Sequence, residues 1–190
     1  PILKKVSAIE LNLSCPNIKH GKRDHLIAQD EEATRLVVKS VRDNTALPII
    51  AKLTPNITDI TKIAKAAEAA GADAVSLINT FYGIAVDIET RKPKLGNITG
   101  GLSGPAIKPL AVRFVYEAHK VIDIPIIGIG GIMDYKDAIE FMLCGAAAVQ
   151  VGTANFVNPA ACIDIVKGIK AYSEKNGLKS MADIIGKLKI

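Results

Sequence analysis

The sequence lacks several features that mark whole classes of protein. Tryptophan is absent and aromatic residues make up only 4% of the chain, which argues against a surface that stacks nucleic-acid bases. The net charge is +5, but the lysines and arginines are scattered, so we expect an ordinary solvated surface and no nucleic-acid partner. The longest apolar runs are too short to span a bilayer, so we expect no membrane attachment.

Cysteine is scarce as well. An odd total of three in 190 residues argues against a disulfide framework and favours a reducing, cytoplasmic environment. Cys144 and Cys162 lie in alanine-rich helical stretches and are interpreted as packing residues. The three histidines do not have the spacing of metal ligands, so no metal site is expected.

What is present is the composition and pattern of a folded α/β domain. Hydrophobic residues make up 49% of the chain and charged residues 23%, as in a globular protein with a sizeable core. Short apolar runs alternate with amphipathic stretches, which predicts a parallel sheet covered by helices. The predicted strands are residues 7–13, 49–53, 74–79, 126–130 and 148–152, and the predicted helices are residues 30–42, 59–70, 105–121, 135–144 and 159–175, with 178–188 as a candidate terminal helix.

Two consecutive predicted strands end in glycines, at Gly130-Gly131 and at Gly152-Thr153. Bare backbone N–H groups near a helix N-terminus bind phosphate oxygens, and such a pair is typical of strands seven and eight of a (β/α)8 TIM-type barrel. The alternative architecture is an open doubly wound sheet. Because the glycines favour the barrel, we expect an incomplete barrel of approximately strands four to eight, either as a fragment or completed by another chain.

Residues 81–104 are too long for a simple connection between a strand and a helix. Two short extended stretches flank residues 90–92, which predicts a small surface hairpin. We expect this segment to be an insertion over the barrel mouth, where it would cover a ligand or meet a partner. The rest of residues 1–190 is expected to belong to one barrel domain.

The first predicted strand ends in a thiol and two carboxamides. Pro16 cannot donate to a sheet ladder, so the strand should stop there and bring Asn12, Cys15 and Asn17 to its carboxyl end. Parallel α/β folds bind ligands at that edge. The thiol can move a proton, and the amides can hold a planar polar substrate. The alternative for Cys15 is a small residue of the core.

Lys52 lies inside an apolar run, and lysine is almost never fully buried without a partner. One interpretation is a structural ion pair with Glu10 on the adjacent strand. The other is a cation beside an anionic cofactor or substrate. Asn79 and Thr80 end the third predicted strand, where they either extend the polar edge or form a turn.

Together these motifs resemble the dihydroorotate dehydrogenase family. The matching stretches are ELNLSCPN from Glu10, AKLTPNITDI from Ala51, SLINT from Ser76, NITGGLSGPAIKP from Asn97, IIGIGGI from Ile126 and AVQVGTANF from Ala148. They cover nearly all of this chain but only the C-terminal portion of the family's barrel. The resemblance implies an FMN-dependent (β/α)8 enzyme that oxidises dihydroorotate to orotate in pyrimidine (UMP) synthesis.

The resemblance also implies roles for single residues. Cys15 would remove the C5 proton of dihydroorotate while a hydride passes from C6 to N5 of FMN. Lys52 would act beside Cys15 and contact the flavin ring. The implied substrate-binding residues are Asn12, Asn17, Asn79 and Thr80. The implied cofactor-binding residues are Lys52, Ile78, Gly104, Gly130, Gly131, Gly152 and Thr153.

The cysteine base and the stretches KLTPNITDI and NITGGLSGPAIKP look most like class 1B of the family. That class implies a homodimer and an electron-transfer subunit with FAD and a [2Fe–2S] cluster, for which this chain has no cysteine cluster. Three alternatives remain: a catalytically silent half-barrel fragment, a domain like that of dihydropyrimidine dehydrogenase, and a phosphate-binding isomerase or lyase without flavin. Since the first barrel strands are absent, we expect impaired or no activity from this chain alone.

Overall fold

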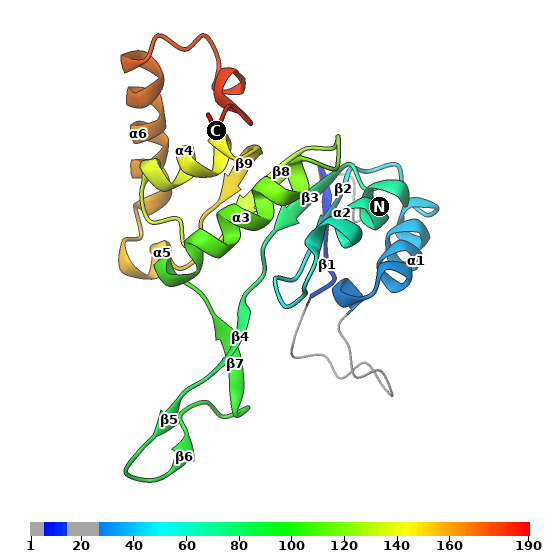
Figure 1. Ribbon diagram of the computed structural model, residues 1–190, viewed down its shortest axis with the longest axis vertical. Coiled ribbons are helices and arrows are strands. Elements are labelled where there is room, and N and C mark those ends of the chain that lie inside the picture. The colour runs from blue at the N-terminus through cyan, green and yellow to red at the C-terminus, as the bar shows by residue number, and fades with distance from the viewer. Residues whose placement is uncertain (1–5, 15–26) are drawn as a thin grey trace.

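The computed structural model describes residues 6–14 and 27–190. Its centre is a sheet of five parallel strands that follow one another in the sheet as they do in the chain (Figure 1). The strands are β1 (Ile9–Asn12), β2 (Ile49–Lys52), β3 (Ala74–Leu77), β8 (Ile126–Ile129) and β9 (Ala146–Gln150). The five predicted strands are therefore present, although β9 starts and ends two residues earlier than expected because the chain leaves the ladder before Gly152.

Helices lie in the connections between the strands of this sheet and after its last strand. They are η2 (Ile27–Gln29), α1 (Glu31–Arg42), α2 (Ile60–Ala69), η3 (Pro105–Ile107), α3 (Lys108–His119), α4 (Tyr135–Leu143), α5 (Ala154–Val157), α6 (Ala161–Lys175) and η4 (Met181–Ile184). Each long helix packs on the next, α1 on α2, α2 on α3, α3 on α4 and α4 on α6. They therefore form one layer, as on the outside of a barrel wall, whereas a doubly wound sheet has helices on both faces.

Within the described ranges the sheet is open, with β1 and β9 as its two edges. No helix in these ranges is both long and apolar enough to cross a membrane.

Side chains that cap the helices explain where several of them begin. Asp30 accepts a hydrogen bond from the Ala33 N–H at the start of α1, and Asp134 caps α4. At α2 the cap is Asp59, which accepts from the Thr61 N–H. A carboxylate is a good acceptor for these unpaired N–H groups.

The candidate helix over 178–188 is wrong. Only the single turn η4 forms there, with Ser180 as its cap. The N–H of Gly186 donates to the Met142 carbonyl, and the N–H of Leu188 donates to the Leu143 carbonyl. These hydrogen bonds tie the segment to the end of α4, so its backbone does not continue as a helix.

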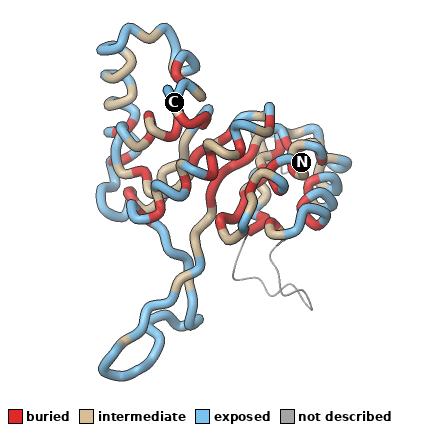
Figure 2. Tube along the Cα trace, viewed as in Figure 1, coloured by how far each residue is buried: buried red, intermediate tan, exposed pale blue. Residues whose placement is uncertain are grey.

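The core lies between the sheet and the helix layer, where buried residues concentrate (Figure 2). Phe114 and Phe141 are its largest side chains. A Cβ at Gly128 would lie 2.4 Å from the Phe141 ring, so this strand residue must be glycine for the ring to rest on the sheet. Cys144 is buried here as expected, and burial raises the pKa of its thiol, which makes that thiol unreactive.

Cys162 is not the packing residue that the sequence predicts. It is exposed, because it lies on a face of α6 that the other described elements leave uncovered. Its Sγ donates to Asn155 Oδ1 at 3.4 Å.

Residues 81–102 form an arm that projects away from the sheet (Figure 1). In it β4 (Phe81–Ile84) pairs with β7 (Thr99–Leu102), and β5 (Val86–Asp87) pairs with β6 (Lys92–Pro93), both antiparallel. Most of the arm is exposed (Figure 2). That it covers a barrel mouth stays a prediction.

Candidate functional site

A pocket of about 240 Å³ lies at the carboxyl ends of β2, β3, β8 and β9. Lys52 is the last residue of β2, and Ile78, Gly130 and Gly152 follow the other three strands. The pocket therefore sits at the edge where parallel α/β folds bind their ligands. Its lining includes these residues expected from the sequence: Lys52, Ile78, Asn79, Thr80, Gly104, Gly130, Gly131, Gly152 and Thr153.

One side of the pocket is built from backbone. Gly131 has a φ of 76°, and a Cβ there would lie 2.9 Å from both the Gly104 carbonyl oxygen and the Lys108 nitrogen. Only glycine fits this close approach between the loop after β8 and the start of α3. A Cβ at Gly152, in contrast, would meet nothing within 4 Å and would project into the pocket.

The N–H groups of Gly131, Gly152 and Thr153 have no acceptor among the residues that the structure describes. Thr153 Oγ1 donates to Ser103 Oγ at 2.8 Å, which joins the end of β9 to the segment before η3. Free N–H groups on a shaped backbone loop are a suitable cradle for a phosphate.

A cluster of ion pairs next to Gly131 holds the loop after β8, which forms the backbone side of the pocket. Lys108 Nζ contacts Asp137 Oδ1 at 2.7 Å and Glu140 Oε2 at 2.6 Å, and Asp137 Oδ2 accepts from the N–H groups of Met133 and Asp134. Burial alone would raise the pKa of Asp137, but the hydrogen bonds from Lys108 and the two N–H groups lower it. The hydrogen bonds to both carboxylates raise the pKa of Lys108. Asp137 and Lys108 are therefore both charged at neutral pH.

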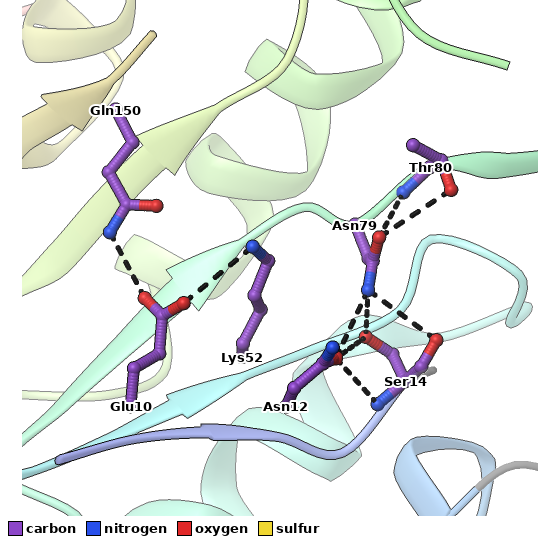
Figure 3. A network of polar contacts seen from close by, with 7 residues as sticks. All are labelled: Glu10, Asn12, Ser14, Lys52, Asn79, Thr80 and Gln150. Carbon is purple, nitrogen blue, oxygen red and sulfur yellow. Dashed lines mark hydrogen bonds and ion pairs between the residues drawn. The ribbon is translucent and has the colours of Figure 1, made fainter. Parts of the chain in front are cut away.

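Asn79 and Thr80 line another side of the pocket, and a cluster of side-chain amides and hydroxyls holds them (Figure 3). Asn79 Nδ2 donates to Ser14 Oγ at 2.7 Å and to Asn12 Oδ1 at 3.2 Å. Asn79 Oδ1 accepts from the Thr80 N–H at 2.8 Å. Asn56 Nδ2 in turn donates to the Thr80 carbonyl at 3.0 Å. Amides and hydroxyls from the ends of β1 and β3 are thus brought together, as the sequence predicts for Asn12, Asn79 and Thr80.

Lys52 forms the ion pair that one interpretation predicts, and its place in the pocket is compatible with the other, which stays a prediction. Its Nζ lies 3.6 Å from Glu10 Oε1 on the adjacent strand, and the residue also lines the pocket. Glu10 Oε2 accepts from Gln150 Nε2 at 3.0 Å (Figure 3). The ion pair and the exposure of the lysine to a ligand are not exclusive, because an ammonium has three donors.

Cys15 and Asn17 lie outside the described residues. Among the described residues, no group of three or more histidine, cysteine, aspartate or glutamate side chains is placed to hold a metal ion.

Sequence reasoning missed part of the site. Ser14 stands between predicted residues but was given no role, although it is buried and contacts Asn79. Ser103 could have been found from the sequence because it adjoins Gly104, an expected cofactor-binding residue. Nothing in the sequence indicates Phe156. The unexpected lining residues are Ser103, Ile107, Ile129, Ile132 and Phe156.

Comparison with known proteins decides the family. A family model described as dihydroorotate dehydrogenase matches residues 2–172. The chain belongs to the dihydroorotate dehydrogenase family. It is 57% identical, over 97% of its length, to the catalytic subunit of dihydroorotate dehydrogenase B (NAD(+)) from Caldicellulosiruptor bescii. It is 53% identical, over 99% of its length, to the subunit of the same name from Geotalea daltonii. The chain spans 61% of the length of each of these relatives.

A solved structure shows the fold. Dihydroorotate dehydrogenase from Eimeria tenella, crystallised with ferulenol, superposes with a TM-score of 0.77 and 24% identity, over 95% of this chain and 54% of that one. The expectation of an incomplete (β/α)8 barrel is thereby confirmed, with five consecutive parallel strands and no closure within the described residues.

Proposed function

We propose that this chain carries the FMN- and substrate-binding part of an enzyme that oxidises dihydroorotate to orotate in pyrimidine synthesis. The observation that carries the proposal is the two-sided pocket. Free N–H groups suited to a phosphate lie on one side of it, and on the other lie Asn79 and Thr80, which a cluster of carboxamides and hydroxyls holds in place. Membership of the family supports the same reaction.

The residues present fit FMN. The open space beside Gly152 leaves room for a phosphate within reach of the N–H groups of Gly131, Gly152 and Thr153. Ile78 and Gly104 offer apolar and backbone surface to the ring, and Lys52 offers a positive charge to it. When bound, FMN supplies the acceptor for the hydride of the substrate. A cation at Lys52 stabilises negative charge that develops nearby.

Asn12, Asn79 and Thr80 are proposed to hold the pyrimidine ring and its carboxylate, together with Asn17. Their donors and acceptors lie at the ends of β1 and β3, on either side of β2, and are held by one another. Groups fixed in this way orient a planar substrate without first having to be ordered.

Cys15 is proposed as the base that takes the C5 proton. The thiolate is the reactive form of a cysteine, and a cation beside the sulfur favours that form.

We expect Cys15→Ser to slow reduction of the flavin by dihydroorotate by about 10²- to 10⁴-fold, the usual contribution of a general base. The measurement is stopped-flow absorbance in a chimera that adds the remaining part of the Caldicellulosiruptor bescii relative. The matched control is Cys162→Ser, which changes an exposed thiol. Equal rates for Cys15→Ser and the control would remove Cys15 from the mechanism.

The catalytic-subunit relatives support further proposals. We propose a class 1B assembly, in which this chain belongs to a cytoplasmic homodimer whose partner subunit carries FAD and a [2Fe–2S] cluster and passes electrons to NAD.

The test of the function is titration of the purified chain with FMN, followed by anaerobic addition of dihydroorotate. Quenching of flavin fluorescence with subsequent bleaching supports the proposed reaction. Binding without bleaching supports the second candidate, a catalytically silent fragment, which the open sheet and the 61% coverage favour. Absence of binding to both the chain and the chimera would refute the flavin site.

A further inference from the structure

We propose that Glu10 is a positioning residue that holds the Lys52 ammonium at the wall of the pocket, and that Gln150 in turn fixes Glu10. The three residues come from β1, β2 and β9, so the arrangement links the first, second and last strands of the sheet (Figure 3). That Glu10 positions Lys52 does not depend on the proposed function. That Glu10 also influences a bound flavin rests on the proposed function.

The contacts use both oxygens of the carboxylate. Glu10 Oε1 lies 3.6 Å from Lys52 Nζ, and Glu10 Oε2 accepts from Gln150 Nε2 at 3.0 Å. A glutamate held at one oxygen loses much of its rotamer freedom, so its second oxygen presents a fixed charge to the lysine. The side-chain exposures of Lys52 and Glu10 are only 24% and 29%, which limits screening of the pair by solvent.

The position of the three residues separates their roles. Lys52 lines the pocket, whereas Glu10 and Gln150 do not. Glu10 and Gln150 lie on the two edge strands and meet across the face of the sheet that the helices do not cover. Side chains of opposite strands meet in this way inside a barrel. Glu10 therefore reaches the lysine from the neighbouring strand β1, while Gln150 holds Glu10 from the opposite edge of the sheet.

Glu10 also offsets the charge of Lys52. With the Glu10 carboxylate in place, its negative charge cancels part of the positive electrostatic field that the Lys52 ammonium produces in the pocket. Without it, the full positive charge faces any ligand. Glu10 therefore acts on the strength with which Lys52 stabilises an electron-rich ring, as well as on where the ammonium lies.

The first test needs no flavin. In the full chain, the ¹³Cε–¹Hε NMR signals of Lys52 should show two distinct Hε protons, because the side chain is held. Those of an exposed lysine such as Lys136 should coincide. Glu10→Gln and Gln150→Leu should each make the Lys52 pair coincide, whereas Glu89→Gln, an exposed residue of the arm, should change nothing.

Unchanged Lys52 signals in Glu10→Gln would overturn the proposal. If that variant does not fold, Gln150→Leu decides on the same signals. A change in Glu10→Gln without one in Gln150→Leu would retain Glu10 and overturn the part assigned to Gln150.

The second test uses bound FMN. Glu10→Gln should tighten binding of reduced relative to oxidised FMN by about tenfold, an upward shift of ~30 mV in the two-electron potential. In a Lys52→Met background the same substitution should produce no shift. A purely structural role for Glu10 would weaken both redox forms alike and leave the potential unchanged, which would overturn the electrostatic part. If the wild-type chain and chimera bind no FMN, the proposed function fails, and the NMR test still decides the positioning.

Discussion

The two sides of the pocket are made in different ways. On the side of β3, the amide of Asn79, which donates to Asn12, presents chemistry that depends on which side chain is there. On the side of β8 and β9, Gly131 and Gly152 present backbone N–H groups, and what matters is that no side chain is there. Binding on one side therefore depends on which side chains are present, and binding on the other depends on the absence of side chains.

Because of this difference, substitutions on one side should change mainly ligand affinity, and substitutions on the other should also change the stability of the fold. The amide cluster is partly exposed and self-contained, so changes in it should alter binding more than folding. The loop at Gly131 is wedged between Gly104 and Lys108, so a side chain there must disturb the start of α3. Substitutions on the two sides should thus have distinguishable signatures.

The largest effect is expected from Gly131→Ala. The new Cβ would approach the Gly104 oxygen and the Lys108 nitrogen to 2.9 Å, at a φ of 76° that alanine rarely adopts. Backbone strain and overpacking should together lower the free energy of unfolding by about 2–4 kcal/mol. Urea unfolding measures the loss, and FMN fluorescence quenching measures the accompanying loss of affinity.

Gly152→Ala is the matched control for that substitution. Its Cβ would meet nothing within 4 Å, so stability should stay within about 0.5 kcal/mol of wild type, while the methyl group in the pocket weakens FMN binding. Equal destabilisation by the two alanines would show that the distinction between wedged and open glycines is wrong.

A smaller effect, confined to binding, is expected from Asn79→Ala. The change removes the donor to Ser14 and Asn12 and the acceptor for the Thr80 N–H. Leaving polar groups of the cluster without partners should weaken orotate binding by about 1–3 kcal/mol, roughly 5- to 150-fold. Isothermal titration of the FMN-loaded protein with orotate measures it.

Asn97→Ala, on the exposed arm, is the control for Asn79→Ala. A loss of orotate affinity equal to that of the control would remove Asn79 from the site.

The sequence could predict the backbone side better than the side-chain network. Glycines after apolar strands are a local signal, and Gly130, Gly131 and Gly152 indeed reach one pocket. The contact between Glu10 and Gln150 joins residues 140 positions apart, and no local pattern indicates that the sheet curls enough for them to meet. Lys52 shows the same limit, because one residue can both form an ion pair and line a pocket.

Two predictions that are wrong, the helix over 178–188 and the packing role of Cys162, have a similar physical cause. The stretch 178–188 has helical spacing, but tertiary hydrogen bonds from Gly186 and Leu188 to the end of α4 replace a helix. The exposure of Cys162 likewise depends on which helices cover α6, and a composition rich in alanine does not reveal that.

The smallest effect is expected from Asp137→Asn, which alters the support of the backbone side without touching the pocket. The pKa of Asp137 is lowered in the folded protein from its ordinary value of 3.8. The stability that this carboxylate contributes is therefore present above that value and is lost as the pH falls through the lower folded pKa. For Lys108, whose pKa is raised, the contribution is present below the ordinary 10.5 and is lost only at more alkaline pH.

Asp137→Asn keeps an acceptor for the Met133 N–H but loses the ion pair, so it should cost about 1 kcal/mol at neutral pH. Because the variant has already lost that contribution, its free energy of unfolding should fall less steeply than that of wild type below pH 4. Urea unfolding between neutral and strongly acidic pH measures both slopes, with Asp123→Asn as an exposed control. Parallel acid profiles for wild type and Asp137→Asn would mean that the loop after β8 is held by Glu140 and the backbone alone.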